Sequence, residues 1–99
     1  MVKWSLPAKI DLKYIHDFIS QDSRFYARKV AEEIIEKSQQ LDSFPGKGRI
    51  VPEVDDSNIR EVFVYSYRLI YQIKKDEIYI LAVIHGKRDL TNINYSETR

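Results

Sequence analysis

The sequence predicts an α+β domain in which a short strand and two helices are followed by three strands. Apolar residues in the first half of the chain recur at steps of three and four, the spacing of helices that bury one face. After residue 57 the spacing changes to two, and the segments are rich in Val, Ile, Tyr and Phe, which suit half-buried strands. The order β-α-α-β-β-β implies a mainly antiparallel sheet with the helical hairpin packed on one face.

The helical half begins with a short strand at residues 2–6. Pro7 follows, and proline is tolerated in the first turn of a helix because its missing N–H would be unpaired there. Asp22 or Ser23 can cap the second helix, and Pro45 ends it. The positions that keep the helical period are Ala8, Leu12, Ile15 and Ile19, with Tyr14 and Phe18 beside them, and then Ala27, Val30, Ala31, Ile34, Ile35, Ser38 and Leu41.

The second half of the chain starts with a segment that has the composition of a loop. Residues 46–57 contain two glycines, a proline and an acidic run. Three strands are then predicted at residues 59–65, 67–75 and 77–85. Lys75-Asp76 is the natural two-residue turn between the last two strands, although it lacks glycine.

This turn fixes which residues oppose one another in the last two strands. On the face that does not form the core, Arg68 then lies opposite Val83, and His85 is one diagonal step away, at roughly 7–8 Å. We therefore expect Arg68 and His85 on the same face, at one end of the sheet. The core face is expected to hold Tyr67, Leu69, Tyr71, Ile73, Ile78, Ile80, Ala82 and Ile84.

The position of Arg60 depends on the turn before Tyr67. If Ser66 is the middle of a three-residue turn, Arg60 shares the face of Arg68. If Tyr65 and Ser66 are themselves the turn, it does not. Nothing in the sequence chooses between the two turns.

A few residues near the end of this sheet could carry chemistry. The Arg68 guanidinium presents a planar fork of donors that matches phosphate or carboxylate, but a surface ion pair with an acid such as Glu61 is its commoner role. His85 could act as an acid or base near neutral pH, or be a structural histidine bonded to a carbonyl. Arg88 and Asp89 could form a local ion pair. No carboxylate and histidine cluster has metal-ligand spacing, and no cofactor is expected.

Length and composition exclude several classes of protein. The 99 residues suffice for one domain, 1–99, in which residues 92–99 form a polar tail that could be flexible or could place Tyr95 at a site. The absence of cysteine excludes disulfides, thiolate zinc sites and cysteine nucleophiles. The net charge of +1 favours no particular partner. No signal peptide or membrane span is visible, so a cytoplasmic protein without a membrane partner is expected.

Two stretches together resemble the RelE/ParE superfamily of bacterial toxins. They are IREVFVYSYRLIY at residues 59–71 and ILAVIHGKRDL at residues 80–90. The loop at residues 44–53 also matches the one that precedes these strands in many ParE-like members. The similarity runs from the opening strand to about Leu90.

The resemblance implies the toxin of a type II toxin–antitoxin system, as in plasmid stabilisation, which arrests growth when free and is neutralised by a cognate antitoxin. Toxin and antitoxin could form a hetero-oligomer that binds operator DNA. ParE-like members inhibit DNA gyrase by stabilising its cleaved-DNA state. RelE-like members are mRNA interferases that work in the ribosome, where the 2′-hydroxyl of the message attacks the adjacent phosphate without a metal. An inactive member that only binds antitoxin is a third alternative.

The resemblance also assigns roles to particular residues. If the chain is a ribonuclease, Arg68, Arg88 and Tyr95 match the positions of catalytic groups. The functional surface expected for either activity consists of Arg60, Glu61, Arg68, His85 and Arg88. RelE-like enzymes place lysines on the strand before Arg68, whereas this chain has only Arg60 there. With the low net charge, this favours a ParE-like gyrase inhibitor over a ribosome-dependent endoribonuclease.

Overall fold

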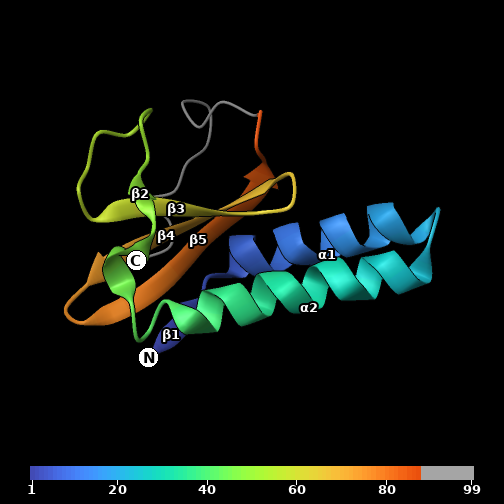
Figure 1. Cartoon of the computed structure of the whole chain (residues 1–99), viewed down its shortest axis with the longest axis horizontal. Helices are drawn as coiled ribbons and strands as arrows, with labels where there is room; N and C mark the ends of the chain where they lie inside the picture. The colour runs from blue at the N-terminus through green and yellow to red at the C-terminus, as the bar shows by residue number, and fades with distance from the viewer. Residues whose placement is uncertain (88–99) are drawn as a thin grey trace.

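The computed structural model describes residues 1–87, which form a five-stranded sheet with a helical hairpin on one face (Figure 1). The strand order is β1-β5-β4-β3-β2; β1 is parallel to β5 and the other neighbours are antiparallel. The predicted α+β order is confirmed. Its elements are β1 (Val2–Trp4), α1 (Leu6–Ser20), α2 (Arg24–Gln40), a 3₁₀ turn η1 (Pro45–Lys47), β2 (Arg49–Ile50), β3 (Ile59–Val64), β4 (Tyr67–Lys74) and β5 (Glu77–His85).

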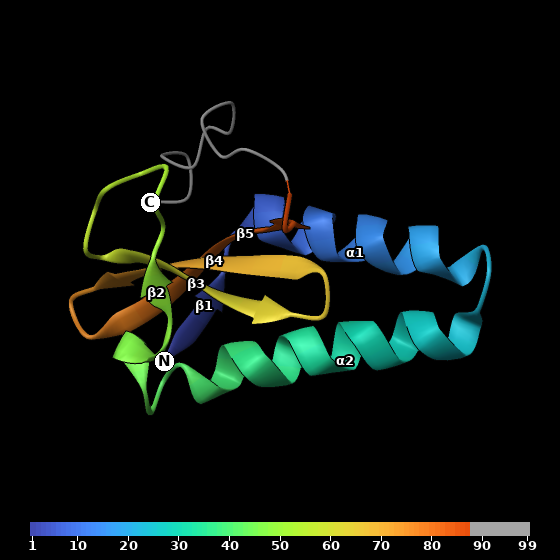
Figure 2. The same ribbon diagram turned by 45° about the horizontal axis from the view of Figure 1, so that its top comes forward.

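Serine residues set the start of both helices. The Ser5 hydroxyl accepts a hydrogen bond from the Ala8 N–H at 3.1 Å, and Ser23 does the same for Tyr26 at 3.1 Å. Of the two predicted caps for α2, Ser23 is therefore the one used. The first helix begins at Leu6, so the predicted strand at residues 2–6 is shorter than expected. Figure 2 shows that the connection between the helices projects beyond the sheet.

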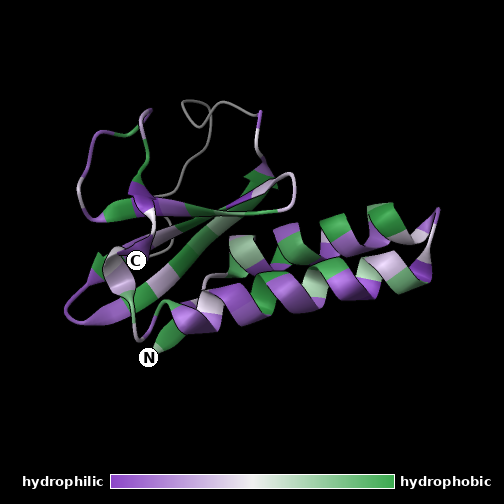
Figure 3. Ribbon diagram, viewed as in Figure 1, coloured by the Kyte–Doolittle hydropathy of each residue, from purple (hydrophilic) through white to green (hydrophobic). Residues whose placement is uncertain are grey.

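The main core lies between the helical hairpin and the sheet. Apolar colouring follows the strands and the helix faces in Figure 3. Burial of these side chains provides the main driving force for the packing of the hairpin on the sheet. The buried members are Ala8, Ile15, Val30, Ile34, Leu41, Val62, Val64, Leu69, Tyr71, Ile78, Ile80 and Val83.

A second, smaller core lies on the opposite face of the sheet, where residues 51–58 fold back over the strands. This segment and β2 together make up most of the loop predicted at residues 46–57. The sequence does not predict β2, because a strand of two residues is too short to show alternating apolar and polar positions. The opposite face of the sheet is therefore covered in part by its own connecting segment. The buried members are Val51, Ile59, Ile70, Leu81, Ala82 and Ile84, with Val54 and Tyr79 packed against them.

The pairing of β4 and β5 follows the predicted register only as far as Tyr71, which faces Ile80. The register then shifts by one residue, and Ile70 faces Ala82, so that Leu81 is the extra residue of a bulge. Side chains beyond the bulge exchange faces, and Ala82 and Ile84 lie in the second core rather than the main one. Their predicted place in the main core is therefore wrong.

The same shift overturns the expected opposition of Arg68 and Val83. Arg68 faces Ile84, and His85 faces Tyr67, so Arg68 and His85 lie on opposite faces of the sheet. Between β3 and β4, Tyr65 and Ser66 form a two-residue turn, because Val64 faces Tyr67. This turn settles the position of Arg60, which the sequence left open. Arg60 lies opposite Tyr71, on the face of the sheet away from Arg68.

A buried tyrosine attaches η1 to the sheet. The Tyr71 hydroxyl donates a hydrogen bond to the Pro45 carbonyl at 2.7 Å and accepts one from the Gly48 N–H at 2.9 Å. Burial raises the pKa of this hydroxyl above its ordinary value. The backbone approach is close, since a Cβ on Gly48 would lie 2.5 Å from the Glu61 carbonyl and 2.6 Å from the Tyr71 hydroxyl.

Gly48→Ala is therefore expected to lower the free energy of unfolding by about 1–3 kcal/mol, as overpacking does. Gly46→Ala is the matched control, because a Cβ there meets nothing within 4 Å, and we expect a change within about 0.5 kcal/mol. Urea unfolding followed by circular dichroism measures both. Equal stabilities for the two variants would show that Gly48 is not held against Tyr71.

Candidate functional site

Four charged side chains form an ion cluster on the second face of the sheet. Arg68 and Glu61 are buried in it, whereas the side chain of Glu53 is 24 % exposed and that of Arg49 is 61 % exposed. Arg68 is only 4 % exposed, and it donates to both oxygens of Glu53 at 2.9 Å. It also donates to Glu61 at 2.6 Å, and Arg49 binds the other oxygen of Glu61. Glu61 and Arg49 are neighbours across β2 and β3, whereas Glu53 comes from the segment that folds back over the sheet.

The cluster balances two guanidinium groups against two carboxylates, and it pairs the buried Arg68 and Glu61, as buried charges require. The hydrogen bonds to Glu53 raise the pKa of Arg68 above its ordinary value, and Glu61 adds to this, while burial works in the opposite direction. Glu61, an expected member of the functional surface, has a fully buried side chain. The expected ion pair of Arg68 and Glu61 is therefore present, but it is buried rather than on the surface.

The other predicted site residues lie elsewhere. Arg60 donates to the Gly48 carbonyl at 2.9 Å, so it takes part in fixing the backbone next to β2. His85 is exposed, and its ring meets the Tyr67 ring edge-on at 6.1 Å. Arg88 and Tyr95 lie outside the described residues 1–87. The prediction that Arg68 and His85 share a face is wrong, because the bulge in β5 shifts the register between them, and no sequence signal indicates this bulge.

An apolar groove of about 540 Å³ lies between α1 and the ends of β4 and β5. Sequence reasoning missed it. The sequence did contain a signal for it. A second series of apolar residues, spaced four apart, runs along α1 beside the series that is buried. One helix cannot bury both series against the same sheet, so the second series stays exposed. This exposed stripe consists of Leu6, Ile10, Tyr14 and Phe18, between 58 % and 72 % exposed. The groove is lined by Ile10, Asp11, Tyr14, Ile15, Phe18, Tyr67, Val83, Ile84 and His85.

One wall of this groove is an open sheet edge. β1 pairs with β5 only as far as Ile80, and residues 81–85 have no neighbouring strand on that side within residues 1–87. Asp11 accepts a hydrogen bond from the Val83 N–H at 3.0 Å, and Ser5 donates to the Leu81 carbonyl at 3.3 Å. Side chains of the α1 region thus satisfy part of an edge that would otherwise be ready to bind another chain.

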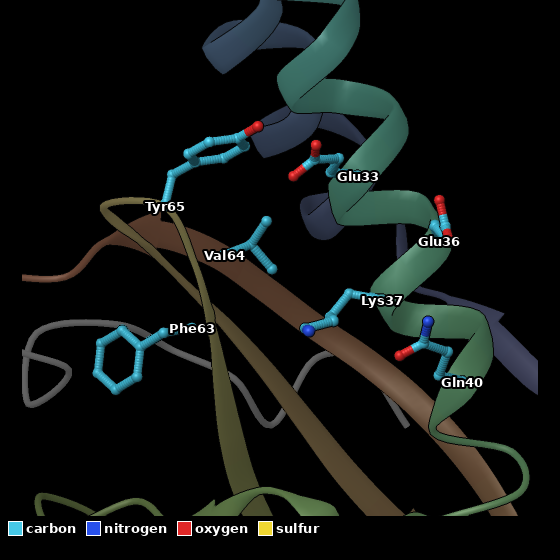
Figure 4. A pocket seen from close by; sticks show the side chains of 7 residues that line it. All are labelled: Glu33, Glu36, Lys37, Gln40, Phe63, Val64 and Tyr65. Carbon is cyan, nitrogen blue, oxygen red and sulfur yellow. The ribbon is translucent and has the colours of Figure 1, made fainter.

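A second cleft, of about 320 Å³, lies between α2 and the tip of the β3–β4 hairpin (Figure 4). Polar side chains of α2 form one wall, and the Tyr65 ring and Val64 form the other. A hydrogen bond with Glu33 raises the pKa of Tyr65 above its ordinary value. Tyr65 has a φ of 54°, in the left-handed region that larger residues seldom adopt.

Neither a metal nor a membrane is indicated by the part of the chain that the structure describes. Residues 1–87 contain no group of three or more His, Cys, Asp or Glu side chains placed to hold a metal ion. No helix within them is long and apolar enough to cross a bilayer.

Arg68→Met is expected to lower the free energy of unfolding by about 3–5 kcal/mol, because it removes the buried guanidinium that pairs with the Glu61 and Glu53 carboxylates. Arg28→Met is the control: this arginine is 76 % exposed on α2, and we expect a change within about 0.5 kcal/mol. Both are measured by chemical unfolding. If Arg68→Met were as stable as the control, the cluster would not be holding the segment on the sheet.

Comparison with known proteins agrees with this geometry. A solved structure of a chromosomal ParDE TA system from P. aeruginosa is similar, with a TM-score of 0.72 and 22 % sequence identity, covering 87 % of this chain and 95 % of that one. At that identity the likeness shows the fold. No curated protein matches the chain. The family model described as "ParE toxin of type II toxin-antitoxin system, parDE" matches residues 2–90, so the chain belongs to the ParE toxin family.

Proposed function

We propose that this toxin arrests growth by binding DNA gyrase and stabilising its cleaved-DNA state. The observation that carries the proposal is the burial of Arg68 against Glu53 and Glu61. If a ribonuclease used this arginine to bind a phosphate, the guanidinium would first have to break its hydrogen bonds to two carboxylates. The phosphate would then have to lose its own hydration to replace them. The arrangement therefore supports a toxin that acts by binding rather than by cleaving RNA.

In this proposal Arg68 and Glu61 shape the domain, and exposed residues contact the target. His85 remains a candidate for that contact, since it is exposed at the mouth of the apolar groove. Arg60 is engaged with backbone carbonyls and serves to fix β2 next to β3. Arg88 stays in the proposed surface on the strength of the resemblance alone.

We further propose that the apolar groove beside α1 binds the antitoxin. An exposed apolar stripe that faces a groove is typical of surfaces that receive an amphipathic helix or an added strand. The groove offers both, because the α1 side chains line one wall and the open edge of β5 the other. The resulting complex is proposed to be cytoplasmic and to bind operator DNA.

The decisive experiment is a supercoiling and cleavage assay with purified gyrase, plasmid and toxin. We expect linear cleaved plasmid to accumulate and supercoiling to fall, with messages left intact in a translating extract. Cleaved messages without an effect on gyrase would make the chain a RelE-like ribonuclease. If neither occurs and the antitoxin still binds, the chain is an inactive member.

Phe18→Asp is expected to weaken antitoxin binding at least about 30-fold, the effect of losing one hot-spot side chain. Phe25→Asp is the control, because Phe25 is 68 % exposed on α2 and does not line the groove. Isothermal titration with the purified antitoxin measures both affinities. Unchanged binding by Phe18→Asp would place the antitoxin elsewhere.

A further inference from the structure

In the described part of the chain, the outer edge of β3 has no neighbouring strand over its last residues. β2 pairs with β3 only at Arg60 and Glu61. Since Val64 flanks the two-residue turn, its backbone groups bond to β4, and those of Phe63 point away from β4. The same alternation places the Ile59 carbonyl on the outer side, where it accepts from the Val51 N–H at 3.2 Å. Within residues 1–87, no such bond reaches the N–H or carbonyl of Phe63.

Large apolar side chains are exposed along this edge of the sheet. An open strand edge with apolar neighbours is a template for pairing with another chain. Natural sheets usually cover such an edge or place charged residues on it. Here the charged residues lie on the neighbouring helix, α2. The exposed side chains are Ile50 at 42 %, Phe63 at 48 % and Tyr65 at 55 %.

The charges above the edge have a self-complementary order. Glu33, Glu36, Lys37 and Gln40 follow one another along the face of α2 that lines the cleft (Figure 4). A two-fold axis that passes between Glu36 and Lys37 would set Glu36 of one copy opposite Lys37 of the second copy, and Lys37 opposite Glu36. It would also set Glu33 opposite Gln40. Glu36 and Lys37 form no ion pair with each other or with any other residue in the part of the chain that the structure describes.

We infer that a second copy of this chain binds here, with the two β3 strands antiparallel and the two α2 helices side by side above them. A two-fold contact of this kind is self-complementary by construction. It brings the two β3 strands together at Phe63, beyond the two residues that β2 covers. The backbone groups of Phe63 gain partners, and two Glu36–Lys37 pairs form across the axis. An unrelated partner would need both a free strand edge and charges in an order complementary to Glu36 and Lys37. A second copy of this chain has both.

This surface is separate from the groove proposed for the antitoxin. β3 and β2 lie at one edge of the sheet, whereas β1 and the open part of β5 lie at the other. Self-association therefore leaves the α1 groove accessible, and it depends on neither the gyrase target nor the antitoxin site.

Sedimentation equilibrium of the purified toxin, separated from its antitoxin, tests the inference. We expect a species of twice 11.8 kDa at concentrations up to about 100 µM, where interfaces of micromolar affinity are populated. Lys37→Glu and Glu36→Lys each place like charges across the axis and are expected to weaken the dimer at least about tenfold. The double variant Glu36→Lys/Lys37→Glu restores opposite charges and is expected to restore the dimer.

Two further variants separate this interface from any other. Phe63→Pro removes the outward N–H without removing a bond to β4, and it is expected to weaken the dimer. Phe18→Asp, in the antitoxin groove, is expected to leave the dimer unchanged. A monomer at every concentration would overturn the inference, and so would a dimer that resists both Lys37→Glu and Phe63→Pro. If Phe63→Pro fails to fold by circular dichroism, the charge exchange on the surface of α2 decides alone.

Discussion

The pairing of Arg68 with Glu53 and Glu61 is the interaction on which the second face of the sheet depends. A buried guanidinium is tolerated only when carboxylates surround it, and one of these carboxylates comes from the segment that folds back over the strands. When residues 51–58 pack on the sheet, Glu53 therefore pairs with the Arg68 charge, and Val51 and Val54 complete the smaller core. Without Glu53 in place, Arg68 would lose the carboxylate that accepts from both of its terminal nitrogens.

With that face covered in part, the α1 stripe and the two sheet edges are among the surfaces that residues 1–87 leave open for binding. The outermost strands are short: β1 covers β5 only to Ile80, and β2 covers β3 only at two residues. Among residues 1–87, β5 and β3 thus each keep an end with no neighbouring strand on the outer side. The two ends differ chemically, since one adjoins an apolar groove and the other lies beneath a row of mixed charges. This difference favours different partners at the two edges.

The periodicity of the sequence predicts the helices, the three long strands and their order, because each buries one face over many residues. It does not predict the bulge at Leu81, since residues 80–84 are all apolar and suit either face of the sheet. The partner of Arg68 is hidden for another reason: Glu53 lies in a segment with no period, so nothing local indicates its path. The apolar groove could have been predicted from the series Leu6, Ile10, Tyr14 and Phe18.

The case of Arg68 shows why a matching residue does not carry its function with it. A match to the family fixes the position of the arginine on β4, but its chemistry depends on what surrounds the guanidinium. Here Glu61 approaches from the neighbouring strand and Glu53 from the folded-back segment, and together they occupy the fork that a phosphate would need. A single loop carboxylate can therefore convert an arginine suited to phosphate binding into one that holds the fold together. On this argument Glu53, rather than Arg68, is the residue whose presence favours a binding toxin over a ribonuclease.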